Sequence, residues 1–364
     1  MRVEDIETPA VVLDHTRVRR NIARMAEMAR GHGVALRPHT KTHKLPALAR
    51  WQLDAGASGI TVAKVSEAEV MAAAGLTDIF IANELVAPAK IRRLAALARW
   101  ITVSVGVDSR EGADALDSGA LTEGASLRVM IEVNTGLDRC GVLPGEAVLD
   151  LAHYIGGKEG LAFDGIFTHA GHAYASCSPQ QRDAVGAGEG RAMAETARLL
   201  AAHGFAPTRV SVGSTPTARS SAAVQGVTEV RPGNYVFHDC MQVGLGVTNW
   251  DDCALRVRAT VISRPHPCRA VIDAGSKTLG SDVSPHVRGH GRLCEYPHGL
   301  LARLSEEHGV ITFEGPENQL RVGEVVTIIP VHACPVTNLA NEVYLVDGER
   351  VEAVWPVLGR GKVE

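Results

Sequence analysis

Short apolar runs alternate with longer amphipathic segments along the first two thirds of the 364-residue chain. The apolar runs have the length and composition of strands, and the segments between them repeat apolar residues with the period of a helix. A helix is also predicted ahead of the first strand, from Thr16, its expected N-cap, to Gly31. The eight predicted strands lie at residues 34–41, 59–63, 78–83, 102–107, 126–133, 165–170, 209–214 and 228–233.

This alternation predicts an α/β fold in which helices join parallel strands. Eight such strands are the number that closes a (β/α)8 barrel, or TIM barrel. A doubly wound open sheet is the alternative, but the chain lacks the glycine-rich turn that such a sheet often carries for a dinucleotide. After about residue 250 helical segments become few, and a second, β-rich domain is predicted. Its strands are expected at 254–265, 268–276, 309–315, 325–331 and 342–348.

Composition and charge narrow the classes of partner. The net charge is −4, the sequence pI is near 6.4 and no basic tail is present, which argues against a nucleic-acid partner. No apolar run is long enough to span a membrane, and the acidic N-terminus lacks the apolar core of a signal peptide. Seven cysteines are scattered without paired spacing, as in proteins whose thiols stay reduced. We therefore expect a cytoplasmic protein that binds neither nucleic acid nor a membrane.

The stretch RPHTKTHK, from Arg37 to Lys44, places five basic side chains within eight residues. On a strand, Arg37, His39 and Lys41 would project to the same side, and Lys44 would fall outside that row. A partly desolvated lysine among other cations has a lowered pKa, so its free amine can form a Schiff base. A basic loop that faces solvent or an acidic neighbour is the alternative.

Loops after three later strands carry small hydroxyl, glycine and histidine residues. In a barrel these loops meet at the C-terminal ends of the strands, and those after the seventh and eighth strands commonly bind phosphate. Taken singly, each stretch is also an ordinary turn containing Gly and Ser. The residues are His169, His172 and Tyr174 after the sixth strand, Gly213, Ser214, Thr215 and Thr217 after the seventh, and Gly233, Asn234 and Tyr235 after the eighth.

Two further stretches have side chains that suit ligands. Arg139, in the loop NTGLDRCG after the fifth strand, could bind a polar group on a ring cofactor, or it could be a surface arginine in a turn. His332 and Cys334 lie two residues apart in VHACPVTN, so on an extended segment both would face one side and could bind zinc. Two protein ligands would leave positions open for water and substrate. A chance HxC in a strand is the alternative.

Together these stretches resemble the D-threonine aldolase and D-serine dehydratase family. That family belongs to the fold-type III pyridoxal 5'-phosphate (PLP) enzymes, as alanine racemase does. The resemblance runs through ETPAVVLD, RPHTKTHK, GITVAKVSEAE, THAGHAY, VSVGSTPT, EVRPGNYVF, SEEHG and HACPVTN, and the combination of RPHTKTHK with a late HxC is specific. It implies a PLP-binding TIM-barrel domain over residues 1–248 and a C-terminal β domain with a metal site over residues 249–364.

The resemblance also implies a role for each candidate residue. Lys41 would form the Schiff base with PLP, and Arg139 would lie beside the polar edge of its ring. His332 and Cys334 would bind a divalent metal, zinc or alternatively manganese, beside the β-hydroxyl of the substrate. Family members are homodimers in which the β domain of one chain helps to close the barrel mouth of the other. The phosphate would be held by Ser214, Thr215, Gly233 and Asn234, and His169 and Tyr174 would line the pocket.

For activity, the resemblance implies a lyase acting on small 3-hydroxy-D-amino acids. PLP stabilises negative charge at Cα, and a metal on the β-hydroxyl would help it to leave, giving a 2-oxo acid and ammonia. Removal of the hydroxyl proton would instead break the Cα–Cβ bond and give glycine and an aldehyde. Family aldolases typically carry HxD where this chain has His332 and Cys334. A D-serine dehydratase reaction is therefore predicted, with D-threonine aldolase cleavage as the alternative.

Three other interpretations are less favoured. Racemisation gives a metal at the β-hydroxyl no task. A non-catalytic PLP carrier would resemble the barrel alone, whereas this chain continues for more than a hundred residues with a metal motif. A structural zinc clip would need four protein ligands, and the motif offers two.

Overall fold

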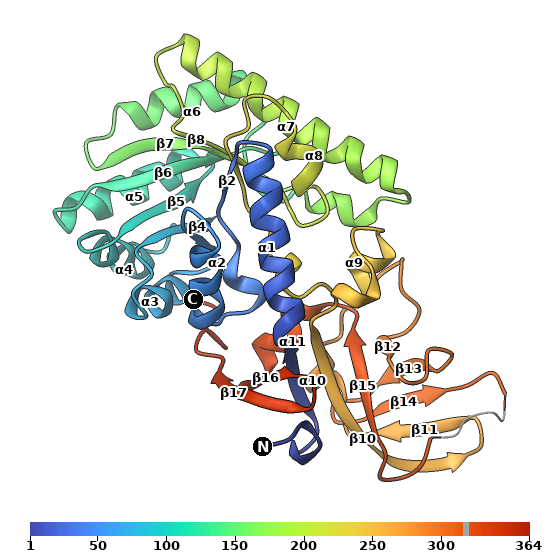
Figure 1. Cartoon of the computed structure of the whole chain (residues 1–364). Helices are drawn as coiled ribbons and strands as arrows, with labels where there is room; N and C mark the ends of the chain where they lie inside the picture. Colours follow the sequence, from blue (N-terminus) through green and yellow to red (C-terminus); the bar gives the residue numbers. More distant parts are fainter. Residues whose placement is uncertain (316–319) are drawn as a thin grey trace. The chain divides into compact units, whose positions relative to one another are not determined.

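The computed structural model describes residues 1–315 and 320–364. The chain forms two compact units, each assembled from segments that are not adjacent in the sequence (Figure 1). The domain limits expected from the sequence, 1–248 and 249–364, stay a prediction. Unit 1 consists of Met1–Ala23, Thr42–Leu45 and Asn234–Gly361, and unit 2 consists of Arg24–Lys41, Pro46–Gly233 and Lys362–Glu364.

Unit 2 contains an eight-stranded parallel sheet with the order β2-β9-β8-β7-β6-β5-β4-β3. Main-chain hydrogen bonds join its two end strands, since Ser58 N donates to Leu36 O at 2.9 Å and Thr61 N donates to Pro38 O at 2.8 Å. The sheet therefore closes into a barrel, and the predicted (β/α)8 fold is confirmed. Its strands are β2 (Ala35–Leu36), β3 (Ile60–Val62), β4 (Asp78–Glu84), β5 (Thr102–Val107), β6 (Leu127–Glu132), β7 (Leu161–Phe167), β8 (Arg209–Val212) and β9 (Glu229–Val230).

Helices pack on the outside of this sheet, and their apolar residues form one core with those of the strands (Figure 1). Two of the helices begin at a serine that accepts a main-chain hydrogen bond, Ser109 from Gly112 N and Ser178 from Gln181 N. The helices of unit 2 are α2 (Pro46–Asp54), α3 (Val65–Ala73), α4 (Pro88–Ala98), α5 (Arg110–Thr122), α6 (Glu146–Gly156), α7 (Pro179–Ala202) and α8 (Ala218–Ala222).

Helix α1 (His15–Gly31) includes residues of both units. Its start corrects one prediction, because Thr16 lies within the first turn and is not the N-cap. The carboxylate of Asp14 accepts the N–H of Arg17 at 2.8 Å instead. An aspartate just ahead of the helix supplies the acceptor that the free N–H groups of the first turn require.

Unit 1 contains a nine-stranded sheet with the order β11-β14-β13-β12-β15-β10-β1-β16-β17. A further pairing between β10 and β11 closes the strands from β11 to β10 into an antiparallel barrel. The predicted β-rich region is confirmed, although β1, β12, β13 and β17 were not expected. The strands are β1 (Ala10–Asp14), β10 (Leu255–His266), β11 (Arg269–Ile272), β12 (Gly291–Leu293), β13 (Leu300–Leu304), β14 (Gly309–Thr312), β15 (Val325–Pro330), β16 (Glu342–Asp347) and β17 (Arg350–Pro356).

Short helices complete the fold. Unit 1 has α9 (Cys240–Gly244), α10 (Ser276–Leu279) and α11 (Ala333–Leu339). Across residues 1–315 and 320–364, none of the helices combines the length and the apolar character that crossing a membrane requires. The 3₁₀ turns among the described residues are η1 (Val3–Asp5), η2 (Thr40–Thr42), η3 (Gly171–Ala175), η4 (Asn234–Val236) and η5 (Trp250–Asp252).

Candidate active site

Lys41 lies just beyond strand β2, in the 3₁₀ turn η2. Pro38 has no N–H to donate to a neighbouring strand, which explains why the strand stops before it. The prediction that Arg37, His39 and Lys41 form one row on a strand is therefore wrong. Lys41 nevertheless follows the C-terminal end of a barrel strand, where this fold places its active sites.

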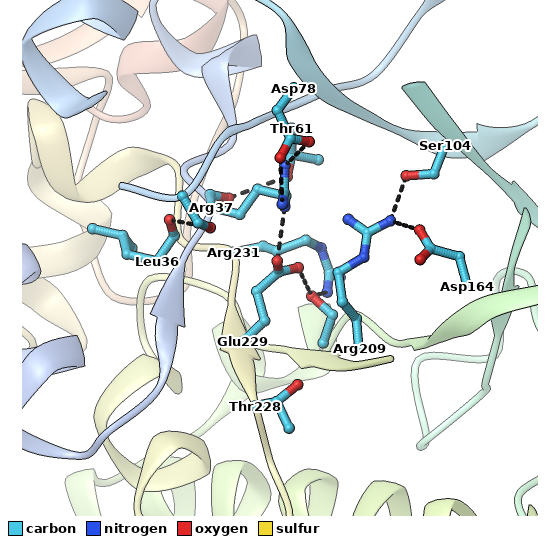
Figure 2. Close-up of polar contacts among 12 residues, drawn as sticks. Leu36, Arg37, Thr61, Asp78, Ser104, Asp164, Arg209, Thr228, Glu229 and Arg231 are labelled. Atoms are coloured by element: carbon cyan, nitrogen blue, oxygen red, sulfur yellow. Dashed lines mark hydrogen bonds and ion pairs between the residues drawn. The ribbon is translucent and has the colours of Figure 1, made fainter. Parts of the chain in front are cut away.

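Arg37 belongs to a buried ion network inside the barrel. Its guanidinium donates to Glu229 Oε2 and to Asp78 Oδ1, each at 2.7 Å. Figure 2 shows these side chains pointing toward one another, with the guanidinium groups of Arg209 and Arg231 close by. Arg37, which directly follows β2, is thus bonded to β9 and β4, and this basic residue of the RPHTKTHK stretch supports the barrel.

The loop after β7 places His169 among positive charges. Burial, followed by the charges of Lys41, Arg139 and Arg231, lowers the pKa of His169 to about 3, so its imidazole is neutral at pH 7. A hydrogen bond also joins His169 to the main chain of Gly213, in the loop after β8. The structure therefore brings three of the predicted site residues, Lys41, Arg139 and His169, to the same end of the barrel. Tyr174 lies further along the same loop, in η3.

The loop after β8 holds Ser214 and Thr215, both of which are buried. Glu189, a fully buried residue of α7, fixes this loop, because its carboxylate accepts Gly213 N at 2.9 Å and Thr217 Oγ1 at 3.2 Å. Burial raises the pKa of Glu189 to about 7. Sequence reasoning missed this residue, and a glutamate flanked by two glycines in a long helical segment was its only signal.

A pair of carboxyl groups at the ends of β4 and β6 was also missed. Burial and then the neighbouring Glu132 raise the pKa of Glu84 to about 8, so Glu84 keeps its proton at pH 7. Glu132 lies 3.5 Å from the guanidinium of Arg139. The ligand atoms of Glu84, Glu132 and Cys140 lie within 4.8 Å of one another. Glu84 and Glu132 thus lie together at the ends of their strands, and Glu132 contacts Arg139.

In unit 1, His332 and Cys334 do not lie on one extended segment, so that prediction is wrong. His332 is the extended residue that precedes α11, and Cys334 lies in the first turn of the helix. The two side chains still interact, and His332 Nδ1 lies 2.6 Å from Asp282 Oδ2. Burial lowers the pKa of His332, but the charge and hydrogen bond of Cys334, the charge of Asp239 and the hydrogen bond to Asp282 outweigh it and raise the pKa to about 10.

Thr42 connects this cluster to the RPHTKTHK stretch. Cys334 Sγ lies 3.2 Å from Thr42 Oγ1, and Thr337 Oγ1 donates to Thr42 O at 2.6 Å. Thr42 is the residue that directly follows Lys41 in the chain. Lys44, in contrast, is buried within unit 1, and its carbonyl oxygen accepts Gly359 N at 3.1 Å. The two lysines of the stretch therefore belong to different units.

Asn234 and Asp239 lie on the segment that follows β9. Asn234 is buried and comes directly after Gly233, the last residue of the long unit 2 segment. Its side-chain Oδ1 atom is buried and makes no hydrogen bond within the described ranges. Its amide nitrogen donates to Asp239, which sequence reasoning missed. Burial raises the pKa of Asp239, while the charge of His332 and hydrogen bonds from its neighbours oppose that rise.

Comparisons with known proteins identify similar sequences and a similar structure. The family described as "Alanine racemase, N-terminal domain" matches residues 13–240, and "Putative serine dehydratase domain" matches residues 254–346. A D-threonine aldolase from Arthrobacter sp. is 35% identical over 361 residues, which are 98% of this chain and 93% of the relative. The D-threo-3-hydroxyaspartate dehydratase from Delftia sp. (strain HT23) is 36% identical over 348 residues, with 90% and 91% covered. A solved structure described as a cysteine-to-alanine mutant of D-threo-3-hydroxyaspartate dehydratase in the metal-free form is 33% identical, with a TM-score of 0.92 and 98% of each chain covered.

Proposed function

Because this chain belongs to the family of the alanine racemase N-terminal domain and continues into a serine dehydratase domain, we propose that it is a PLP- and metal-dependent lyase of 3-hydroxy-D-amino acids. One observation carries the proposal. Cys334, an expected metal ligand, has its Sγ 3.2 Å from Thr42, the residue next to the expected PLP lysine, Lys41. The proposed substrates carry their amine and their hydroxyl on adjacent carbon atoms. D-Threonine and D-threo-3-hydroxyaspartate, for which the two relatives are named, both do so.

The residues present fit PLP. Three cations act on one neutral imidazole, that of His169, which suits a ligand with a negatively charged phosphate. Gly213 has a φ of +100°, a conformation that lets main-chain N–H groups of a loop turn toward an anion. We assign Lys41 as the covalent anchor, Arg139 to the ring edge, His169 and Tyr174 to the pocket wall, and Ser214, Thr215, Gly233 and Asn234 to the phosphate.

The donor set of unit 1 fits a divalent metal. The imidazole of His332 and the thiol of Cys334 are ligands that zinc prefers, and manganese is the alternative. Asp282 accepts a hydrogen bond from Nδ1 of His332, which would leave Nε2 for the metal and fix the orientation of the ring. The metal-free form described for the dehydratase relative supports a metal in this family.

Each residue of the site then has a defined task. PLP, when bound, supplies an electron sink for negative charge at Cα, and the metal supplies Lewis acidity toward a hydroxyl. Lys41 Nζ is the expected acceptor of the α-proton. His169, neutral at pH 7, can form hydrogen bonds without adding a further positive charge to the pocket. Glu189 fixes the loop after β8, which carries Ser214 and Thr215, through its hydrogen bonds to Gly213 and Thr217.

Between the two lyase reactions, we favour β-elimination, the D-serine dehydratase type. The motif carries Cys334, whereas aldolases of the resembled family typically carry aspartate at that place. Retro-aldol cleavage of D-threonine type remains the second candidate, because the relatives include an aldolase at 35% identity. We also propose that the protein is a homodimer, as members of the resembled family are.

Product analysis tests the proposal. Purified protein with PLP and zinc is incubated with D-threonine, with L-threonine as the stereochemical control, and a second sample is first treated with a chelator. Elimination gives 2-oxobutyrate and ammonia, and retro-aldol cleavage gives glycine and acetaldehyde. We expect the former, only from the D-isomer and only with metal. Absence of any product from D-threonine, D-serine and D-threo-3-hydroxyaspartate, or undiminished turnover after chelation, would contradict the proposal.

A further inference from the structure

Asp239 has no exposed surface and connects two parts of unit 1 that the proposed function uses. Its Oδ2 atom accepts from Asn234 Nδ2 at 2.5 Å and from the main-chain N of Ala333 at 2.9 Å. Its Oδ1 atom accepts the N–H of Gln242 at 3.1 Å and so caps α9. One oxygen atom is therefore shared between a residue assigned to the phosphate and the residue that lies between the two assigned metal ligands.

The short helix α9 is held against the segment that leads into α11. Met241 N donates to Val331 O at 3.1 Å, and Cys240 Sγ donates to Ile329 O at 3.2 Å. These bonds limit independent movement of the two segments. A displacement of either one must move the shared carboxyl group or break a hydrogen bond to a buried polar group, which is costly.

The side-chain amide of Asn234 is hydrogen-bonded at one of its two polar atoms. Its Nδ2 atom donates to Asp239, and its buried Oδ1 atom has no hydrogen-bond partner in the described ranges. The orientation of this amide therefore depends on the carboxylate. Asn234 directly follows Gly233, so an anion bound by the main chain at these residues would constrain the same amide.

We propose that Asp239 is a positioning residue that couples the binding of PLP to the binding of the metal. This inference rests on the proposed function and adds a thermodynamic link between its two ligands. A phosphate at Asn234 fixes one donor to the shared oxygen, and a metal at His332 and Cys334 fixes the other, the N–H of Ala333. The first ligand orders the shared acceptor, so the second binds at a smaller entropic cost. By reciprocity, each ligand must strengthen the other by the same factor.

Two zinc titrations of the apoprotein test this link. Zinc affinity is measured by competition with a chromophoric chelator, once without PLP and once after PLP loading and removal of the excess by desalting. We expect PLP to strengthen zinc binding at least about 5-fold, the lower end of usual coupling between two sites. The reciprocal measurement, PLP affinity from its absorbance with and without zinc, should give the same factor. Equal zinc affinities in the two titrations would overturn the inference.

Two variants test the link by removing either the shared acceptor or one of its donors. Asp239→Ser keeps a hydroxyl that can cap α9 but removes Oδ2. Asn234→Ala removes the amide donor and leaves Asp239 bonded to Ala333 N. Asp239→Ser should still bind zinc and PLP separately, and Asn234→Ala should still bind zinc while its PLP affinity falls. In both variants the coupling factor, the ratio of zinc affinities with and without PLP, should fall to about one. A purely structural role for Asp239 would lower stability and leave the factor of the folded protein unchanged, and that result in both variants would overturn the inference.

Asp273 provides a matched control in the same unit. Its carboxylate accepts Thr260 N at 2.8 Å and Thr8 Oγ1 at 2.6 Å, a comparable pair of bonds. Asp273→Ser should keep the wild-type coupling factor. If Asp239→Ser does not fold, the wild-type titrations and the Asn234→Ala variant still test whether zinc and PLP binding are coupled. Wild-type protein that binds neither ligand would refute the proposed function itself, whereas independent binding of both would refute only the link.

Discussion

Two histidines of the proposed site, one in each unit, have opposite acid–base properties. In unit 2, burial and then three nearby cations lower the pKa of His169 to about 3. In unit 1, burial also lowers the pKa of His332, but Cys334, Asp239 and Asp282 outweigh burial and raise the pKa to about 10. The same side chain is thus neutral in one unit at pH 7 and, without metal, positively charged in the other.

The difference arises from the charges around each imidazole. Unit 2 gathers lysine and arginine side chains, and a ligand that carries a phosphate would neutralise them. Unit 1 gathers a thiol and carboxylates, and a divalent cation would replace the proton of His332 as their partner. The charges indicate that unit 2 suits an anionic ligand and unit 1 a cationic one. This difference can be tested by removing one residue at a time.

The largest effect is expected from Lys41→Ala in unit 2, which gathers the positive charges. Loss of the covalent anchor should abolish the visible absorbance of bound PLP and reduce turnover by about 10⁴-fold or more. Absorbance after desalting and a coupled assay of 2-oxo acid formation measure the two effects. Lys44→Ala is the matched control, because Lys44 belongs to unit 1 and contacts Gly359. It should keep the absorbance, and the reverse pattern would overturn the assignment of the lysine.

A smaller effect is expected from Asp282→Ala in unit 1, which gathers the thiol and the carboxylates. Without the carboxylate at Nδ1, the ring of His332 loses its fixed orientation, and zinc affinity should fall about 10- to 100-fold. Competition with a chelator measures the affinity. With zinc and PLP at saturating concentration, the absorbance of bound PLP should not change, since Asp282 belongs to unit 1. Asp251→Ala, an exposed aspartate of the same unit, serves as the control. Unchanged zinc affinity in Asp282→Ala would remove this residue from the metal site.

The smallest effect concerns stability and pH. The folded-state pKa of His169, about 3, lies below its unfolded value. As pH falls below about 6.5, the imidazole gains a proton in the unfolded state but not in the folded state, so the free energy of unfolding decreases. Between pH 7 and pH 5 this histidine should cost the protein about 2 kcal/mol of unfolding free energy. The contribution of His332, whose pKa is raised to about 10, is fully present below about pH 6.5 and has begun to decline at pH 7, so it offsets part of this loss. Denaturant unfolding of metal-free, PLP-free protein at both pH values measures the difference.

His169→Gln isolates that contribution. The variant should lose less stability than wild type between pH 7 and pH 5, by about the same 2 kcal/mol. His153→Gln, a substitution of an exposed histidine on α6, should behave as wild type does. Identical losses in wild type and His169→Gln would mean that His169 is not held neutral by its surroundings.

The barrel could be read from the sequence because its strands are mostly buried apolar runs that alternate with helices. The predicted run at 102–107 coincides with β5, and 78–83 falls one residue short of β4. Strand β1 carries an equally apolar run, but both of its partners, β10 and β16, lie more than two hundred residues away, and local pattern does not reveal such pairing. The same limit explains why the place of β1 in unit 1 was not predicted.

The site was predicted unevenly for similar reasons. Residues in loops after barrel strands follow from the rule that strand ends carry function, and Glu84 and Glu132 at two other strand ends could have been found in the same way. The premise of an extended HxC segment was wrong, although Pro335 in the first turn of α11 was a signal for a helix start. Asp239 and Glu189 act through main-chain N–H groups, which no side-chain pattern records.

The pairing of β1 also has a consequence for biosynthesis. Leu13 pairs with Leu255 of β10 and with Leu345 of β16, so β1 emerges from the ribosome long before either flanking strand exists. The barrel strands β2 to β9, in contrast, are complete once residue 230 has been made. During elongation the nascent chain would therefore carry a closed barrel together with an unpaired apolar strand, a segment open to pairing with other chains. Release of the polypeptide before β16 would make that exposure permanent.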